Sequence, residues 1–239
     1  MRRPGVAFAA IVAFIAVFLT VDIWSTRGSQ LLLGAVTWAA LGVALRFARP
    51  EVRVQALLVV CVATCVEVLA SIVWGVYTYR LENLPMFVPP GHGLVYLGGL
   101  SLSLWLASHQ RALIWVALAA VNVWAVLGLA GIPRLDVGGA IGAVLLSYFL
   151  LRGRVPAIYA GVFLVVAGLE LYGTAIGTWE WAETIPGTGI PDGNPPSGIA
   201  SGYVWFDLVA LAFAPRILEL TRRLAGRDPA RTPATTPQP

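Results

Sequence analysis

Long apolar runs recur along the whole chain, and they predict helices that cross a membrane. A transmembrane helix needs about 20 mostly apolar residues, because the hydrocarbon core of a bilayer is about 30 Å thick. The expected spans are Val6–Trp24, Gln30–Phe47, Val54–Trp74, Gly93–Ala107, Ala112–Ala130, Val137–Leu151, Pro156–Ile176 and Ile199–Leu220. The fourth and sixth runs are short, and we expect them to extend by about one turn. The pattern predicts an all-α polytopic membrane protein with about eight transmembrane helices, arranged as two tandem four-helix repeats.

Composition agrees with this interpretation. The chain has 239 residues, of which 58% are hydrophobic and 12% charged, whereas soluble domains carry roughly 25% charged residues. The first apolar run follows Met1-Arg2-Arg3, as in a signal peptide, but no small-x-small cleavage site follows it, so we expect a retained helix. All 16 basic residues are Arg. No Arg cluster interleaves with aromatic residues on a soluble face, so we expect no nucleic-acid partner.

The Arg positions predict the topology. With the N-terminus in the cytoplasm, the outer loops receive only Arg27, Arg80 and Arg134, and the remaining Arg residues fall on the inner side. This asymmetry follows the positive-inside rule. We predict a multi-pass protein of the cell membrane with both termini in the cytoplasm. Its transmembrane domain covers residues 1–225, and a disordered cytoplasmic tail, rich in Pro and Thr, covers residues 226–239.

A pattern in the expected outer loops occurs twice. Each copy has an intramembrane Glu, a hydroxyl residue one turn later, a Gly-x-aromatic-x-aromatic segment and then a Pro pair. The copies run from Glu67 to Pro90 and from Glu170 to Pro196. They lie four helices apart, so we predict a tandem repeat with halves of about 1–108 and 109–225. A pseudo-two-fold axis along the membrane normal would place Glu67 and Glu170 on opposite walls of one cavity.

Ionisable residues inside the bilayer are the candidates for catalysis: Glu67, Glu170 and Asp207. A carboxylate at the bilayer centre costs about 2.5–3.5 kcal/mol. A low dielectric disfavours the charged form, so a neutral carboxyl that donates a proton becomes accessible. We expect Ser71 and Thr174, one turn further on, to hydrogen-bond the two Glu carboxyls. The alternative is that each carboxyl only ties helices together.

Further residues are candidates for substrate binding: Tyr77, Tyr79, Trp179, Trp181, Asn194, Tyr203 and Asn122. The aromatic pairs equally fit the belt that Tyr and Trp form at membrane interfaces. Asn122 fits an interhelical hydrogen bond, and Asn194 fits a turn. The sequence has no metal-ligand spacing, no phosphate loop and no dinucleotide fingerprint, so we expect no metal and no cofactor.

At these residues the chain resembles the integral-membrane carotenoid hydratases of the bacterioruberin type. The matching features are an intramembrane acid, a Gly-x-aromatic-x-aromatic segment and a Pro-containing loop, then a second acidic helix, an aromatic pair and a Gly-x-Pro…Asn loop. They correspond to Glu67, Gly75, Tyr77, Tyr79 and Val88-Pro89, and to Glu170, Gly177, Trp179, Trp181, Gly189-Ile190-Pro191 and Asn194. The chain departs from the family in having Glu170 where the family has Asp, and in its Pro-Pro pairs.

The resemblance implies proton-initiated chemistry on an isoprenoid or carotenoid-like lipid. A buried acid would protonate an alkene, and water or a second alkene would capture the carbocation, giving hydration or cyclisation. Two other classes stay open. Parallel halves with central carboxyls also describe a proton-coupled carrier of a lipophilic molecule, although carriers usually break their helices at the midplane. The third class is a non-catalytic lipid-binding or scaffold subunit. In each case the expected partners are membrane lipids and a lipophilic small molecule, and the oligomeric state is open.

Overall fold

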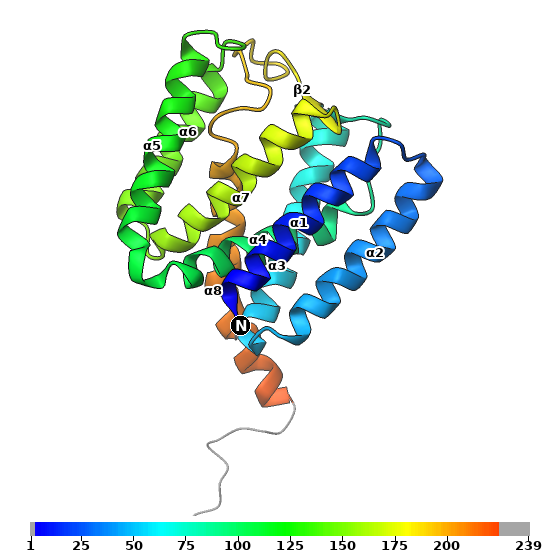
Figure 1. Cartoon of the computed structure of the whole chain (residues 1–239), viewed down its shortest axis with the longest axis vertical. Coiled ribbons are helices and arrows are strands. Elements are labelled where there is room, and N and C mark those ends of the chain that lie inside the picture. Colours follow the sequence, from blue (N-terminus) through cyan, green and yellow to red (C-terminus); the bar gives the residue numbers. More distant parts are fainter. Residues whose placement is uncertain (1–2, 225–239) are drawn as a thin grey trace, which may run out of the picture.

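The computed structural model describes residues 3–224 and is nearly all-α, as predicted. The predicted tail, residues 226–239, lies outside the described residues. The elements are α1 (Pro4–Asp22), α2 (Arg27–Arg46), α3 (Pro50–Glu67), the π-helix η1 (Val68–Trp74), β1 (Tyr77–Tyr79), α4 (Val88–Trp105), the 3-10 helix η2 (Ala107–His109), α5 (Gln110–Leu129), α6 (Val137–Arg152), α7 (Pro156–Ala175), β2 (Trp179–Trp181) and α8 (Ala200–Leu224). Figure 1 shows β2 at the end of the bundle opposite the N-terminus.

Five helical segments in residues 3–224 are long and apolar enough to cross a membrane: α1, α2, α3 with η1, η2 with α5, and α7. Helix α6 is apolar but has 16 residues. Large apolar side chains such as Leu31, Val123 and Val144 are more than half exposed on the outer faces of these helices. Soluble monomers rarely expose so much apolar surface. These features are compatible with a membrane protein.

Helix α4 begins earlier than the apolar pattern predicts, at Val88 in place of Gly93. Pro89 and Pro90 therefore lie in its first turn and not in the preceding loop. Proline is tolerated there because the first N–H groups of a helix have no intrahelical acceptor and because its fixed φ suits the first turn. The two short strands are also absent from the sequence prediction.

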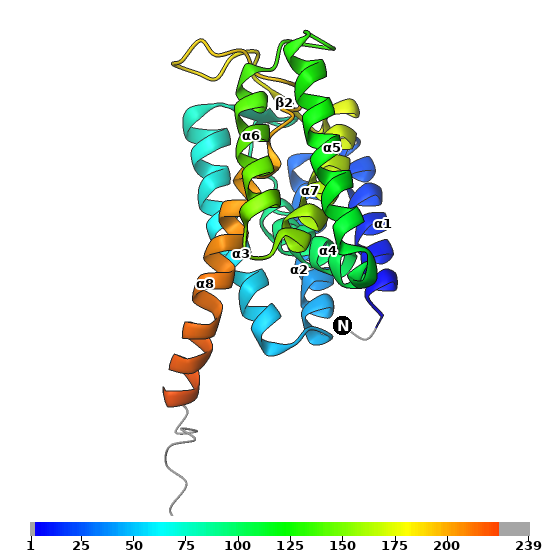
Figure 2. The same cartoon turned by 90° about the vertical axis from the view of Figure 1, so that its left-hand side faces the viewer.

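Helix α4 is the central element of the bundle. It packs against α1, α2, α3 and α7, while α3 packs against α8. Figure 2 shows α4 behind α5 and α7 and surrounded by other helices. The contact between α4 and α7 is close because glycines meet there: a Cβ at Gly161 would lie 2.3 Å from the carbonyl oxygen of Gly99. Small residues allow transmembrane helices to approach in this way.

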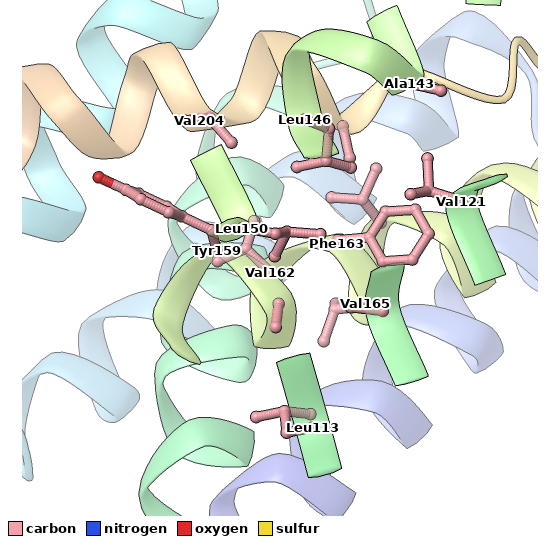
Figure 3. Close-up of a cluster of buried hydrophobic side chains, with 14 of the residues drawn as sticks. Leu113, Val121, Ala143, Leu146, Leu150, Tyr159, Val162, Phe163, Val165 and Val204 are labelled. Atoms are coloured by element: carbon pink, nitrogen blue, oxygen red, sulfur yellow. The ribbon is translucent and has the colours of Figure 1, made fainter. Parts of the chain in front are cut away.

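Two apolar clusters hold the helices together. One joins α5, α6 and α7 with parts of α4 and α8, and Figure 3 shows its side chains, including Val121, Leu146 and Phe163. The other joins α3 and α4 with α1, α2 and α8. Since α4 and α8 contribute to both clusters, the two sides of the bundle are packed as one body.

Arginine side chains fasten the loops at the β2 end of the bundle. Arg80, which follows β1, donates from its guanidinium to the carbonyl oxygens of Asp22 and Ser25, the latter at 2.8 Å. Arg27, at the start of α2, donates in the opposite direction to the carbonyl of Leu81 at 2.8 Å. The α1–α2 loop and the β1–α4 loop are thereby held against each other.

Arg134 has the same role in the second half of the chain. From the α5–α6 loop it donates to the carbonyl oxygens of Asp192 at 2.7 Å, Gly193 at 2.8 Å and Ala182 at 2.9 Å. Asp136 completes this connection, since its carboxyl accepts the backbone N–H groups of Gly193 and of two further residues. The three arginines of the expected outer loops all bind backbone carbonyls of neighbouring loops.

Candidate active site

A two-stranded ribbon covers the candidate site. Gly75 ends η1 with φ 74°, and Gly177 follows α7 with φ 75°. This left-handed conformation favours glycine and turns each chain out of its helix. The strands that follow pair antiparallel, with Tyr77 opposite Trp181 and Tyr79 opposite Trp179. Because side chains alternate along a strand, all four aromatic side chains point to the buried face.

The Tyr pair binds Glu67, which lies where α3 passes into η1. The Tyr77 hydroxyl donates to Glu67 Oε2 at 2.6 Å, and the Tyr79 hydroxyl donates to the same oxygen at 2.7 Å. Burial and the nearby Glu67 raise the pKa of both phenols, so they stay protonated donors. His92, from the first turns of α4, places its Nε2 2.9 Å from Glu67 Oε1. Both oxygens of Glu67 therefore have partners.

The Trp pair binds Glu170 on α7. Trp179 Nε1 donates to Glu170 Oε2 at 2.9 Å, and Trp181 Nε1 donates to the same oxygen at 3.2 Å. The Trp179 ring lies directly on Gly173, where a Cβ would be 2.1 Å from it. Glu170 Oε1 has no hydrogen-bond partner among the described residues and is not sealed from the cavity. The two acids thus differ, since Glu67 uses both oxygens and Glu170 only one.

Glu67 and Glu170 line one cavity of about 270 Å³. Both side chains are buried, with 8% and 5% of their surface exposed. The remaining lining is mostly apolar and aromatic, and it includes Tyr203 of α8. A mostly apolar pocket with few convergent polar groups is typical of a site for a small lipophilic molecule.

Aromatic contacts link the two carboxyl groups. The ring centroids of Tyr77 and Trp181 lie 4.5 Å apart, and each of these side chains donates to one of the acids. On the other wall, the Tyr203 ring lies 5.3 Å from the His92 ring. A pair of contacting aromatic rings therefore connects the hydrogen-bond partners of the two acids.

The structure brings most of the predicted site residues together but leaves others outside the cavity. Asp207 is buried on α8 with Oδ2 unpartnered among the described residues, and it does not line the cavity. Asn122 lies on an exposed face of α5 and donates to Ser147 of α6 at 3.0 Å. Asn194 is also outside, but its Oδ1 accepts the backbone N–H of Trp181 at 3.1 Å and so positions that strand.

The expected hydrogen bonds from Ser71 and Thr174 to the carboxyl groups do not form. Ser71 Oγ donates to the backbone carbonyl of Glu67 at 2.8 Å, and Thr174 Oγ1 donates to that of Glu170 at 2.7 Å. Hydroxyl residues in helices readily bond the carbonyl four residues earlier, which satisfies them locally. The aromatic pairs take the place that we expected these hydroxyls to fill.

Sequence reasoning missed His92, Arg134 and Asp136. The signal for His92 was its position two residues after Pro90, in the second turn of what proves to be a helix. No local pattern marked Arg134 or Asp136, because their partners are up to about sixty residues away in the chain. Within residues 3–224, no three His, Cys, Asp or Glu side chains gather as a metal site would require.

Comparisons with family models, with curated proteins and with solved structures found no match to this chain. The function must therefore be argued from the geometry of the site.

Proposed function

We propose that this protein is an integral-membrane enzyme that begins chemistry on an isoprenoid or carotenoid-like lipid by protonating an alkene. The observation that carries the proposal is that one apolar cavity contains two acids whose hydrogen-bond partners differ. Glu170 exposes an unpartnered Oε1, while both oxygens of Glu67 are bound. An acid acting on an apolar substrate needs this combination of one available proton and one fixed counter-charge.

In this proposal Glu170 donates the proton. Indole N–H groups are donors only, so Oε2 of Glu170 must accept, and a proton on this carboxyl group is placed on Oε1. The proton then resides on Oε1 and points to the cavity. The O–H bond breaks, a C–H bond forms at one alkene carbon, and the other alkene carbon becomes a carbocation, leaving Glu170 as a carboxylate.

Glu67 supplies the negative charge that stabilises the carbocation. Two phenols and one imidazole around a single carboxyl favour its ionised form, because hydrogen bonds to a charged acceptor are stronger than those to a neutral one. The faces of Tyr77, Trp181 and Tyr203 add cation–π attraction. In hydration, a water oxygen bonds to the cation and its spare proton returns to a carboxylate. In cyclisation, a second alkene attacks and a C–H proton returns to a carboxylate.

The same proposal includes about eight membrane spans, two tandem four-helix halves and both termini in the cytoplasm. Support for the repeat comes from the packing of α3 on α8 and of α4 on α7, pairs that the repeat relates to each other. Further support is the pairing of β1 with β2. Support for the topology comes from Arg222 and Arg223, which lie at the end of α8 away from the ribbon.

Turnover tests the function. The purified protein is reconstituted with extracted isoprenoids, and products are followed by mass spectrometry: hydration adds the mass of water, and cyclisation leaves the mass unchanged. We expect Glu170→Gln to slow turnover on the order of 10²–10⁴-fold, the range typical of general acids. Glu180→Gln is the matched control, because Glu180 is exposed on the opposite face of β2. Equal activity of Glu170→Gln and wild type would rule out the enzyme proposal.

Thiol labelling tests the topology in a background in which Cys61 and Cys65 are replaced by Ala. Glu180 and Arg152 are both exposed and lie on opposite sides of the proposed membrane. An impermeant reagent added to intact cells should label Glu180→Cys and leave Arg152→Cys unlabelled. Labelling of position 152 alone would invert the proposed orientation.

A further inference from the structure

A second cavity, of about 680 Å³, lies between α1 and α2. Each wall includes two alanines, Ala7 and Ala10 on α1 and Ala40 and Ala44 on α2, among larger apolar side chains, and α4 contributes Leu94 and Leu97. We call this cavity the α1–α2 groove. Figure 1 shows α2 standing apart from α1, and the two helices make few contacts.

The α1–α2 groove adjoins the cavity that holds the two acids. Phe14 of α1 and Leu94 of α4 line both spaces. Together the spaces follow α1 from Val6 to Leu19, a rise of about 20 Å. A ligand whose end reaches Glu170 and whose chain passes Phe14 and Leu94 would meet mostly apolar side chains along α1.

The side chains of the groove are unusual for two helices that stand apart. Small residues normally let membrane helices come into close contact. Here α1 and α2 present alanines to each other across open space, because both helices pack on α4 instead. At the outer end α2 is held by the β1–α4 loop, where a Cβ at Gly34 would lie 2.6 Å from Met86. The corresponding helices of the second half, α5 and α6, pack against each other.

We infer that the α1–α2 groove binds the hydrocarbon tail of the lipid whose reacting end lies between Glu67 and Glu170. This inference rests on the proposed function and adds the place of the tail. The occupant is an extended, unsubstituted prenyl chain, because the groove is lined by apolar side chains apart from Arg3 at its far end. Its alanines leave room for a chain and offer it no hydrogen bond.

Photocrosslinking in nanodiscs tests the inference directly. The probes are geranylgeraniol with a diazirine at the tail end, the same alcohol with a diazirine beside the hydroxyl, and a phosphatidylcholine with a diazirine in its acyl chain. Crosslinked peptides are mapped by mass spectrometry. We expect the tail label on α1 and α2 within the groove, and the hydroxyl-end label on residues of the acid cavity.

Two alanines that neighbour each other on α2 provide matched variants. Ala40 lines the groove, whereas Ala39 is exposed and does not. Ala40→Phe should reduce tail crosslinking by about tenfold or more, the discrimination that a misfit of one methylene or more produces in an apolar pocket. Ala39→Phe should leave it unchanged. Ala44→Phe repeats the test if Ala40→Phe does not fold.

The outcomes separate this inference from the proposed function. Groove labelling by phosphatidylcholine that equals labelling by the prenyl tail would mean that bulk lipid fills the groove, and it would overturn the inference. So would equal tail labelling in Ala39→Phe and Ala40→Phe. The hydroxyl-end label reports separately on the acid cavity: if it reaches that cavity while the tail label avoids the groove, the proposed function survives and the tail site fails. If the hydroxyl-end label avoids the acid cavity, the proposed function itself fails.

Discussion

Glu67 and Glu170 occupy matching places towards the ends of α3 and α7, yet the side chains that hydrogen-bond their carboxyl groups differ. Glu67 is held by two phenols, which donate to one of its oxygens, and by an imidazole beside the other oxygen. Glu170 is held by two indoles, which donate hydrogen bonds and do not titrate. The same ribbon geometry therefore leaves Glu67 with partners on both oxygens and Glu170 with partners on one oxygen only. The partners differ at three places: Tyr77 and Tyr79 stand opposite Trp181 and Trp179, and His92 contacts Glu67 alone.

Infrared spectroscopy of the two Gln variants is the strongest test of this difference. In the proposed mechanism, Glu170→Gln should remove a carbonyl band of a protonated carboxyl group, whereas Glu67→Gln should leave it, because two phenols donate to Oε2 of Glu67 and His92 lies beside its Oε1. Asp207 is also buried and adds its own signal, so the comparison is made with Asp207→Asn in both variants. Loss of the band in Glu67→Gln alone would reverse the two roles.

Removing the loop arginines should have the next largest effect. Arg134→Met leaves several backbone carbonyls without a donor, and Arg80→Met leaves those of Asp22 and Ser25. We expect each change to lower the free energy of unfolding by about 2–4 kcal/mol, as for charged donors lost from buried acceptors. Unfolding in SDS titrations gives the measurement. Arg27→Met is the control, because Arg27 is exposed and binds a single carbonyl, and a comparable loss there would contradict the interpretation.

Replacing the aromatic donors by phenylalanine should affect Glu67 and Glu170 unequally. In the proposed mechanism, Tyr77→Phe with Tyr79→Phe removes hydrogen bonds to an ionised Glu67, each contributing about 1.5–3 kcal/mol, whereas bonds to a neutral Glu170 contribute about 0.5–1.5 kcal/mol. The Tyr pair change should therefore slow turnover more than Trp179→Phe with Trp181→Phe. It should also create a new band of a protonated carboxyl group. The same band appearing in the Trp variant would argue against the assignment.

The smallest expected effect concerns the loops beside Glu170, where Asp192 lies near Asp136. Burial and the negative charge of Asp136 raise the pKa of Asp192 to about 6, although the positive charge of Arg134 acts to lower it. The fold thus favours protonated Asp192, and its stability falls as the pH rises from about 4 to about 6. Asp192→Asn should remove this dependence and raise the free energy of unfolding at pH 7 by roughly 1 kcal/mol, after allowance for solvent screening.

Asp136→Asn is the counterpart of Asp192→Asn and should lower the free energy of unfolding. The Asp136 carboxyl accepts three backbone N–H groups with its two oxygens. An amide offers one acceptor oxygen, so at least one buried donor loses its partner. We expect a loss of about 1–3 kcal/mol. Stability profiles against pH for the two variants, measured in the same detergent, give the comparison. If Asp192→Asn and Asp136→Asn changed the free energy of unfolding in the same direction, the roles given to these two carboxyl groups would be wrong.

The sequence by itself determined the helical class, the apolar character and the pair of acids. Apolar runs of about 20 residues leave few other structures, because a helix satisfies its own backbone hydrogen bonds. The repeated Gly-x-aromatic-x-aromatic segment was likewise visible in the sequence, since a glycine and alternating aromatics are local features, although the two strands that it forms were not predicted. These inferences needed only neighbouring residues.

Only the tertiary structure decided what each acid touches. The aromatic side chains were expected to line the substrate or the membrane interface. All four line the cavity, and they also donate to the carboxyl groups, because β1 and β2 pair and turn both aromatic rows inward. His92 joins Glu67 because α4 crosses the centre of the bundle, and Asp207 stays out of the cavity. Hydrogen-bond partners from distant segments depend on how helices cross, and no local pattern in the chain encodes that. For this reason the sequence supplied two equal candidates, and the fold made them different.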